Sequence, residues 1–388
     1  MRITAIHEQA MPMKSPIRNA VIAFDEMTTS VLAIVTDVIR DGRQVVGYGF
    51  NSNGRYAQSG LLRDRLLPRL FAATPHSILN DDGSNFDPHR VWNVVMTNEK
   101  PGGHGDRSVA VGVIDMAVWD IVGKIARKPL HQVLAEQFGD GAPDKRVSVC
   151  AAGGYYQEKG IDSLREEIKR YIDAGYKSVK IKIGGVPLID DLRRIDAVLE
   201  IVGSGDRLAV DANGRLDLQR AIEYADALAP YNLRWFEEPV DPLDFALLAQ
   251  LGQYYRAPLA TGENLFSMQD VRNLIRYGGM RVDRDFVQMD PTLSYGLVEY
   301  LRMMDVLRSA GWSGRQVMPH GGQQLALNLV AGLKLGGFEA YPGMFEPFGG
   351  LAETMAVNDG YINLSDEVGI GFEANPRLFK LLDRVATA

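Results

Sequence analysis

Three carboxylates recur along the chain at an even spacing, each at the end of a short apolar run. Asp211 ends Leu-Ala-Val-Asp, Glu237 ends Arg-Trp-Phe-Glu and Glu263 ends Leu-Ala-Thr-Gly-Glu, so the intervals 237 − 211 and 263 − 237 are both 26 residues. One strand, one helix and two short loops fill such an interval. Because the C-terminal ends of neighbouring strands converge in a parallel barrel, the spacing predicts that the acids meet at one site. Oxygen ligands suit a hard divalent cation, so we predict that they bind Mg²⁺.

The segment that carries these acids has the rhythm of an α/β barrel. From about residue 147, eight short apolar runs alternate with amphipathic helical patterns, which is typical of parallel βαβ units. The runs cover residues 147–152, 178–183, 207–212, 234–238, 258–262, 286–289, 315–319 and 338–341. The clearest helical patterns cover residues 164–174, 188–201, 216–228, 244–255 and 268–277, with a weaker one at 323–335.

The first part of the chain has a different pattern. Residues 30–38 and 44–50 alternate and are joined by Asp41-Gly42-Arg43, which predicts a β-hairpin. Helical patterns follow at residues 61–73, 88–97 and 109–138. We therefore predict an α+β capping domain over residues 1–140, a barrel over residues 141–350, and a C-terminal segment, residues 351–388, that packs back on the capping domain.

Composition and charge narrow the class of protein. The chain has 388 residues, of which 46% are hydrophobic, so it can form a barrel with a second domain. A formal net charge of −7 argues against a nucleic-acid surface. The single cysteine, Cys150, permits no internal disulfide, and the chain shows no signal-peptide core and no apolar stretch long enough to span a membrane. We expect a cytoplasmic protein with neither nucleic-acid nor membrane partners.

Two lysines, Lys180 and Lys182, precede the acids by one βα unit in Ser-Val-Lys-Ile-Lys-Ile-Gly. Side chains two residues apart on a strand point to the same side, here the barrel interior near its mouth. Desolvation and a neighbouring cation both lower the pKa of an amine, which suits it to act as a base near neutral pH. The alternative is a pair of lysines that extend into solvent. We favour the catalytic interpretation because the pair stands directly before the acids.

His320 ends Arg-Gln-Val-Met-Pro-His and is the only one of six histidines at a predicted barrel strand end. Asp290 ends the preceding predicted strand, 320 − 290 = 30 residues earlier. On adjacent strand ends the carboxylate can bind one imidazole nitrogen, fix the tautomer and leave the other nitrogen free. A lone histidine is otherwise usually a hydrogen-bonded core or rim residue. Asn213 and Asn264 follow two of the acids, either as turn residues or as contacts to water or substrate.

Five motifs, taken together and in order, resemble those of a known family. Lys-Ile-Lys, Asp-Ala-Asn, Trp-Phe-Glu-Glu-Pro, Gly-Glu-Asn and Met-Pro-His are similar to the motifs of the mandelate racemase group of the enolase superfamily. Each motif is weak alone, and their combination is specific. The resemblance covers nearly the whole chain and implies a modified TIM barrel, (β/α)7β, with an N-terminal α+β capping domain. Relatives are usually multimers, so a homo-oligomer is expected by analogy.

This resemblance implies roles for the matching positions. Lys182 and His320 would be the acid–base pair, and the three spaced acids would bind Mg²⁺. The family also places a glutamate at the last barrel strand near the substrate carboxylate. Glu339 is the positional match, with Glu346 the weaker one. No lysine ends the sixth strand, which separates the chain from the cycloisomerase and N-succinylamino acid racemase branches.

Substrate choice in the group is set by capping-domain loops, which here would be residues 11–19 and 50–58. A buried polyhydroxylated acid needs paired hydrogen-bonding groups, and both loops carry polar side chains, although polar loops are often merely solvated. The predicted substrate contacts are Asn19, Asn53, Lys100, Tyr156, Lys182, Glu237, Glu263, His320, Glu339 and Tyr341.

Lys100 lies in Asn-Glu-Lys-Pro-Gly-Gly-His-Gly, between two capping helices. It would bring a cation to a second carboxylate or to the departing hydroxyl, or else belong to an ordinary flexible loop. With Lys100 in the site, the pattern is most similar to the D-tartrate dehydratases of the group. That resemblance implies α-proton removal by Lys182, loss of the β-hydroxyl assisted by His320, and oxaloacetate as product.

Other functions fit the same residues. A dehydratase of a longer acid sugar, of the galactonate or gluconate type, would not need Lys100. A 2-hydroxy acid racemase would use Lys182 and His320 without a leaving group. A non-catalytic barrel that binds a ligand or partner would have no need of Lys182.

Overall fold

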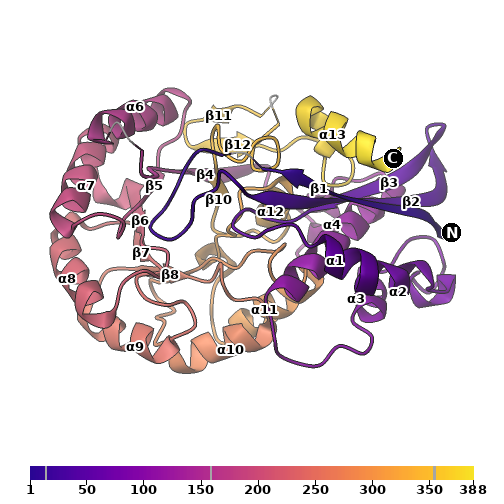
Figure 1. Cartoon of the computed structure of the whole chain (residues 1–388), viewed down its shortest axis with the longest axis horizontal. Coiled ribbons are helices and arrows are strands. Elements are labelled where there is room, and N and C mark those ends of the chain that lie inside the picture. Colours follow the sequence, from indigo (N-terminus) through magenta and orange to yellow (C-terminus); the bar gives the residue numbers. More distant parts are fainter. Residues whose placement is uncertain (14, 158–159, 353–354) are drawn as a thin grey trace.

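The computed structural model describes residues 1–13, 15–157, 160–352 and 355–388 and consists of an N-terminal domain beside a barrel (Figure 1). The N-terminal domain contains the antiparallel sheet β1 (Ile3–Pro12), β2 (Thr28–Arg40) and β3 (Arg43–Phe50), in that spatial order. The predicted hairpin is β2–β3, and it turns at Asp41 and Gly42 with φ of 50° and 77°. Positive φ at both positions matches the twist of a two-residue hairpin turn. Strand β1 was not predicted.

Helix α4 (Asp106–Ala126) lies against β2 and β3 and is buried over most of its length. A Cβ on Gly47 or Gly49 would come within 2.1 Å of the backbone oxygen of Ala117 or Val113, so glycine permits the close packing of α4 on β3. The prediction of one helix over residues 109–138 was wrong. The chain leaves α4 through the left-handed residue Arg127 and starts α5 (Leu130–Phe138) after Pro129.

The barrel strands are β4 (Arg146–Gly153), β5 (Val179–Lys182), β6 (Leu208–Asp211), β7 (Trp235–Glu237), β8 (Leu259–Thr261), β9 (Phe286–Val287) and β10 (Phe338–Ala340). They pair in parallel from β4 to β9, and β10 pairs in parallel with β4. Residues 315–319, predicted as a strand, form only an isolated bridge between Val317 and Val287. The backbone N–H of Gly336 donates to the Val317 carbonyl, 2.8 Å away, and links this bridge to the segment before β10. The fold is therefore the predicted α/β barrel with a capping domain.

Helices surround these strands in an arc (Figure 1). They are α6 (Gly160–Asp173), α7 (Leu188–Val202), α8 (Leu218–Leu228), α9 (Phe245–Tyr254), α10 (Met268–Tyr277), α11 (Leu297–Ser309) and α12 (Gln324–Gly332). Helix α11 was missed, although its apolar residues recur at helical spacing. The capping domain also contains α1 (Ser59–Leu61), a π-helical turn (Leu62–Leu66), α2 (Leu67–Phe71) and α3 (Pro88–Val95).

The C-terminal segment divides between the two domains. Strands β11 (Val357–Asn358) and β12 (Tyr361–Asn363) form a hairpin, and β12 pairs antiparallel with β4 of the barrel. Helix α13 (Pro376–Ala386) packs on β1 and β2 of the capping domain (Figure 1). Residues 353 and 354 of this segment, and residue 14 of the predicted loop 11–19, lie outside the described residues. Among the helices described, none combines the length and the apolar character needed to cross a membrane.

Candidate active site

The register of the barrel strands brings the three spaced acids together. Lys182 pairs with Asp211, and Asp211 pairs with Glu237, so these residues stand side by side at the C-terminal strand ends. Glu263 follows β8 by two residues. One carboxylate oxygen from each of the three acids lies within 4.8 Å of the other two, with Asp211 and Glu237 buried. Such a set of oxygen donors fits a hard divalent cation, and burial of several anions requires a cation among them.

Glu237 is held firmly in this cluster. Its Oε2 atom accepts hydrogen bonds from Trp235 Nε1 and Gln288 Nε2, both at 2.8 Å. Burial, and then the neighbouring Asp211, raise its pKa to about 8. The pKa rises because burial and the charge of Asp211 disfavour the ionised form more than the neighbouring Lys180 favours it. A divalent cation bound to these carboxylates would reverse this effect.

Both lysines of β5 point into the cluster. Lys182 Nζ lies 2.5 Å from Asp211 Oδ2, and Lys180 Nζ lies 2.5 Å from both Glu237 Oε1 and Glu339 Oε1. Burial lowers the pKa of Lys182, but the charges of Asp211 and the other acidic groups together outweigh it, so the net shift is upward. The sequence-based expectation of a lowered pKa therefore does not describe this state. A divalent cation on the same carboxylates would weaken their attraction for the ammonium group of Lys182. It would therefore favour the neutral form of this amine.

His320 and Asp290 are in contact as expected. His320 Nδ1 lies 2.9 Å from Asp290 Oδ2, while His320 Nε2 lies 3.5 Å from Glu263 Oε2. Burial lowers the pKa of His320, but Glu263 and the hydrogen bond to Asp290 raise it to about 9. Asp290 also accepts from the backbone N–H of Thr292 at 2.7 Å and from Ser52 Oγ of the capping domain at 2.7 Å. The imidazole is thus held through Nδ1 with Nε2 directed toward the metal cluster.

A cavity of about 380 Å³ lies between the strand ends and the capping-domain loops. Lys182, Glu263 and His320 line its floor, and Asn19 and Asn53 line it from the capping domain. In Figure 1 the indigo segment between β1 and β2 runs across the barrel strands. At about 30 Å³ for each water, the cavity holds on the order of a dozen waters, enough for a chain of several hydroxylated carbons.

Of the predicted contacts on and after β10, Tyr341 lines the cavity, whereas Glu339 is not among its lining residues, and neither is the buried Glu237. Glu339 is buried on β10, where it pairs with Lys180. The rings of Tyr341 and His320 form a T-shaped pair, with ring centres 6.3 Å apart and an interplanar angle of 75°.

Lys100 and Tyr156, also predicted as substrate contacts, lie away from the cavity and from the carboxylate cluster. Lys100 is exposed, and it is not among the described residues that line the cavity. Tyr156 lines a separate surface pocket, where its hydroxyl group is 3.1 Å from Asp191 Oδ1 and accepts from the backbone N–H of Gly185 at 2.8 Å. Tyr155 lines the cavity instead, with its ring centre 5.3 Å from Lys182 Nζ. Both tyrosines follow Gly153, the last residue of β4, so the alternation of a strand does not decide which of them points into the cavity.

A set of polar residues surrounds the cavity, and the sequence did not show how they connect, although Asn264 was a candidate contact. Glu238 accepts two hydrogen bonds from Asn264 Nδ2, at 2.9 and 3.1 Å, and Asn264 Oδ1 accepts from Arg55 Nη2 at 2.6 Å. Burial, and then the charges of Glu263 and other acids, raise the pKa of Glu238 well above its ordinary value. Arg55 and Arg215 line the cavity as well. No periodicity reports them, because they lie in loops.

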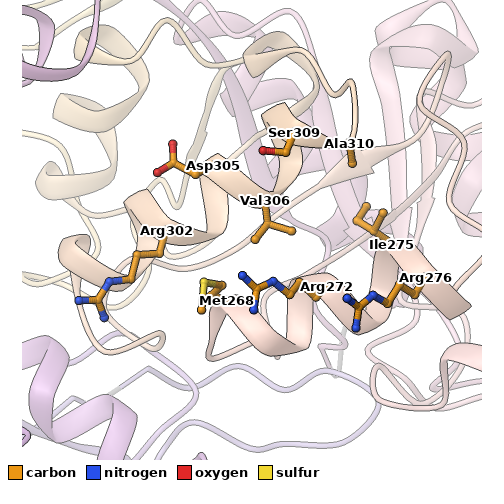
Figure 2. Close-up of a pocket in the computed structure, with 9 residues that line it drawn as sticks. All are labelled: Met268, Arg272, Ile275, Arg276, Arg302, Asp305, Val306, Ser309 and Ala310. Carbon is orange, nitrogen blue, oxygen red and sulfur yellow. The ribbon is translucent and has the colours of Figure 1, made fainter.

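A second groove lies between α10 and α11 on the outer wall of the barrel, and its arginines and apolar residues are shown in Figure 2. The residues that line it include Arg272, Arg276 and Arg302, but neither a lysine nor a histidine. The chemistry therefore belongs to the cavity at the barrel mouth.

Comparison with known proteins identifies the class to which this capped barrel with its three-carboxylate cluster belongs. Residues 163–378 match the family described as enolase C-terminal domain-like, MR_MLE_C, and the chain belongs to this family, the mandelate racemase and muconate lactonizing enzymes of the enolase superfamily. The chain is 29% identical over 371 residues to L-talarate/galactarate dehydratase of Salmonella typhimurium. The match covers 93% of this chain and 86% of that protein. It is 28% identical over 286 residues to arabinonate dehydratase of Saccharolobus solfataricus. That match covers 71% of this chain and 73% of that protein.

The crystal structure of the Salmonella enzyme, liganded with Mg and L-lyxarohydroxamate, superimposes with a TM-score of 0.77 at 25% identity. The match covers 94% of this chain and 88% of that chain. The magnesium in that structure and the carboxylate cluster of this chain both identify Mg²⁺ as the cofactor.

Proposed function

We propose that this protein is a Mg²⁺-dependent dehydratase of acid sugars. The observation that carries the proposal is the placement of Lys182 and His320. Lys182 ends β5, and His320 follows the segment that bridges to β9 through Val317, so β6, β7 and β8 lie between them, and both side chains line one polar cavity. A sugar acid bound by its carboxylate at the metal would present its α-carbon and β-carbon between these two side chains.

In this reaction Lys182, in its neutral form, takes the proton from the α-carbon of the substrate. His320, held through Nδ1 by Asp290, donates a proton from Nε2 to the departing β-hydroxyl group, which leaves as water. The electron pair of the broken C–H bond forms the new double bond, and the resulting enol tautomerises to a 2-keto-3-deoxy acid. Bound Mg²⁺ supplies a Lewis acid that offsets the charge that develops on the substrate carboxylate. Asp290 keeps the imidazole oriented, because it holds Nδ1 at 2.9 Å.

Longer acid sugars are favoured over D-tartrate. The D-tartrate prediction depended on Lys100, which is exposed and does not line the cavity. The relatives described above are named for longer sugar acids, and the cavity has room for a chain longer than tartrate. The predicted alternative, a dehydratase of a longer acid sugar, is therefore the better supported substrate class.

The test is a screen of the purified protein with Mg²⁺ against hexonic, pentonic and hexaric acids and the tartrate stereoisomers, with 2-keto acid formation as the readout. Turnover of one or more longer acid sugars is expected. Exchange of the α-proton in D₂O with no 2-keto acid from any substrate would contradict dehydration and favour a racemase. Turnover of tartrate alone would restore the short diacid.

A further inference from the structure

Two arginines line the mouth of the cavity and take no part in the proton transfers described above. Arg55 comes from the loop after β3 of the capping domain, and Arg215 comes from the loop after β6 of the barrel. The two domains thus each supply one guanidinium group to the same cavity.

The backbone that carries Arg215 is fixed. Asn213 and Gly214 have φ of 48° and 69° and turn the chain over the strand end. The backbone N–H of Gly214 donates to the Glu238 carbonyl at 2.7 Å, and that of Leu216 donates to the Pro239 carbonyl at 3.2 Å. The guanidinium group itself is exposed, and within the described part of the chain it has no hydrogen-bond acceptor and no ion-pair partner.

Arg55 is held in place without being neutralised. Its Nη2 atom donates to Asn264 Oδ1 at 2.6 Å, its Nη1 atom donates to the Gly54 carbonyl at 2.8 Å, and its guanidinium carbon lies 5.4 Å from the ring centre of Phe266. These partners are an amide, a carbonyl and an aromatic ring. The positive charge therefore remains available to a ligand.

The charge balance at the cavity mouth favours an anion. Asp241 also lines the cavity. Its Oδ1 atom accepts a hydrogen bond from the backbone N–H of Leu243 at 2.9 Å, inside its own turn. Of the other acids that line the cavity, Glu263 belongs to the carboxylate cluster, and Glu238 accepts both hydrogen bonds of Asn264 Nδ2. Two guanidinium groups facing one carboxylate leave an excess positive charge, and the planar fork of arginine matches a carboxylate.

We propose that the substrate is an acid sugar with a carboxylate at each end, and that Arg215 and Arg55 bind the carboxylate distal to the reacting carbons. This inference rests on the proposed dehydratase function and adds the substrate class. A monoacid has a hydroxymethyl group at the same position, which leaves both charges without a counter-ion. The relatives include enzymes named for both kinds of acid, so their names alone do not decide between them.

The experiment compares matched acids that differ only at the terminal carbon, galactarate with galactonate and glucarate with gluconate, at saturating Mg²⁺. The wild-type protein is expected to have the higher kcat/KM on a diacid. Arg215→Gln and Arg55→Gln should each lower kcat/KM on the diacid by about tenfold or more, as for loss of a charge-assisted hydrogen bond, and change the value for the monoacid by less than about twofold. Arg272→Gln removes the same charge from the outer groove of Figure 2 and should leave both substrates unaffected.

Preference for the monoacid by the wild-type protein, or equal losses on both acids in Arg215→Gln, would overturn the diacid proposal and leave the dehydratase proposal standing. Failure of the dehydratase proposal would give a different result from failure of the diacid proposal. If no acid sugar gives a 2-keto acid while Mg²⁺ binding is shown by calorimetry, the dehydratase function itself is wrong.

Discussion

Ser52 Oγ of the capping domain donates a hydrogen bond to Asp290 Oδ2 of the barrel at 2.7 Å, and the same oxygen faces His320 Nδ1 at 2.9 Å. Ser52 and Asp290 are both buried and lie 238 residues apart in the sequence. Gly321 packs against the pair, since a Cβ there would come within 2.6 Å of Asp290 Oδ2 and 2.9 Å of Ser52 Oγ. A capping-domain loop therefore helps to orient the histidine that we assign as the acid.

Ser52→Ala removes this contact without adding bulk. Loss of one donor makes the Asp290 carboxylate less stabilised, so it should attract the proton of His320 more strongly and raise the pKa of the imidazole. We expect kcat to fall several-fold and the alkaline limb of the pH–rate profile to move to higher pH, with a loss of stability of about 1 kcal/mol. Ser59→Ala, which removes a hydroxyl that donates to Glu8 elsewhere in the capping domain, is the matched control. An unmoved alkaline limb would show that Ser52 is only structural.

Lys182→Met and His320→Asn should separate the two proton transfers. Lys182→Met should abolish both dehydration and exchange of the substrate α-proton in D₂O, because it removes the base. His320→Asn should lower dehydration by about a hundredfold or more and retain α-proton exchange, because the base is intact. Mass spectrometry of recovered substrate measures the exchange. If His320→Asn lost exchange and Lys182→Met kept it, the two roles would have to be interchanged.

The proton affinity of His320 should depend on the metal. In metal-free protein its pKa is raised to about 9, so its ion pairing stabilises the fold fully below the unfolded pKa near 6.5, and this stabilisation is lost as the pH rises from about 6.5 through about 9. Mg²⁺ neutralises Glu263 and should move the imidazole pKa downward. Titration of the His320 ring signals by NMR, with and without Mg²⁺, measures both values. A pKa that Mg²⁺ leaves unchanged would contradict the role given to Glu263.

Removal of Mg²⁺ should abolish turnover and lower thermal stability. A ligand at about 100 times its Kd stabilises the folded state by about 2.7 kcal/mol, so the melting temperature should rise with Mg²⁺ concentration. Glu263→Gln should weaken this dependence, because it removes one charged oxygen ligand from the cluster. Asp241→Asn, which removes a rim carboxylate outside the cluster, should keep it. Equal responses of the two variants would argue against Glu263 as a ligand.

Gly47→Ala tests the packing of the capping sheet on α4. The new Cβ would lie 2.1 Å from the Ala117 carbonyl oxygen, so sheet and helix must separate, and we expect a loss of about 1–3 kcal/mol or more. Gly60→Ala is the control, since no atom lies within 4 Å of its added Cβ. Chemical unfolding monitored by circular dichroism compares the two. A stable Gly47→Ala variant would mean that the interface adapts.

Much of the candidate site followed from the sequence because strand geometry is local. Asp211, Glu237 and Glu263 repeat at one βα period, and parallel register then puts them at one level of the barrel. Lys180 and Lys182 point to the same side because strand side chains alternate. The helix break at Arg127 was overlooked because the apolar pattern continues across it.

The sequence by itself thus determined the barrel, its cluster of three carboxylates and the residues that flank the cluster, since each depends on a period that a short stretch of chain already displays. Only the tertiary structure decided which loop side chains line the cavity. In the folded protein Ser52 contacts Asp290, and Arg55 lines the cavity. Tyr155 lines it as well, whereas Tyr156 does not, and Lys100 is exposed to solvent. Loops have no repeating geometry, so the position of their side chains is set by the docking of one domain on the other.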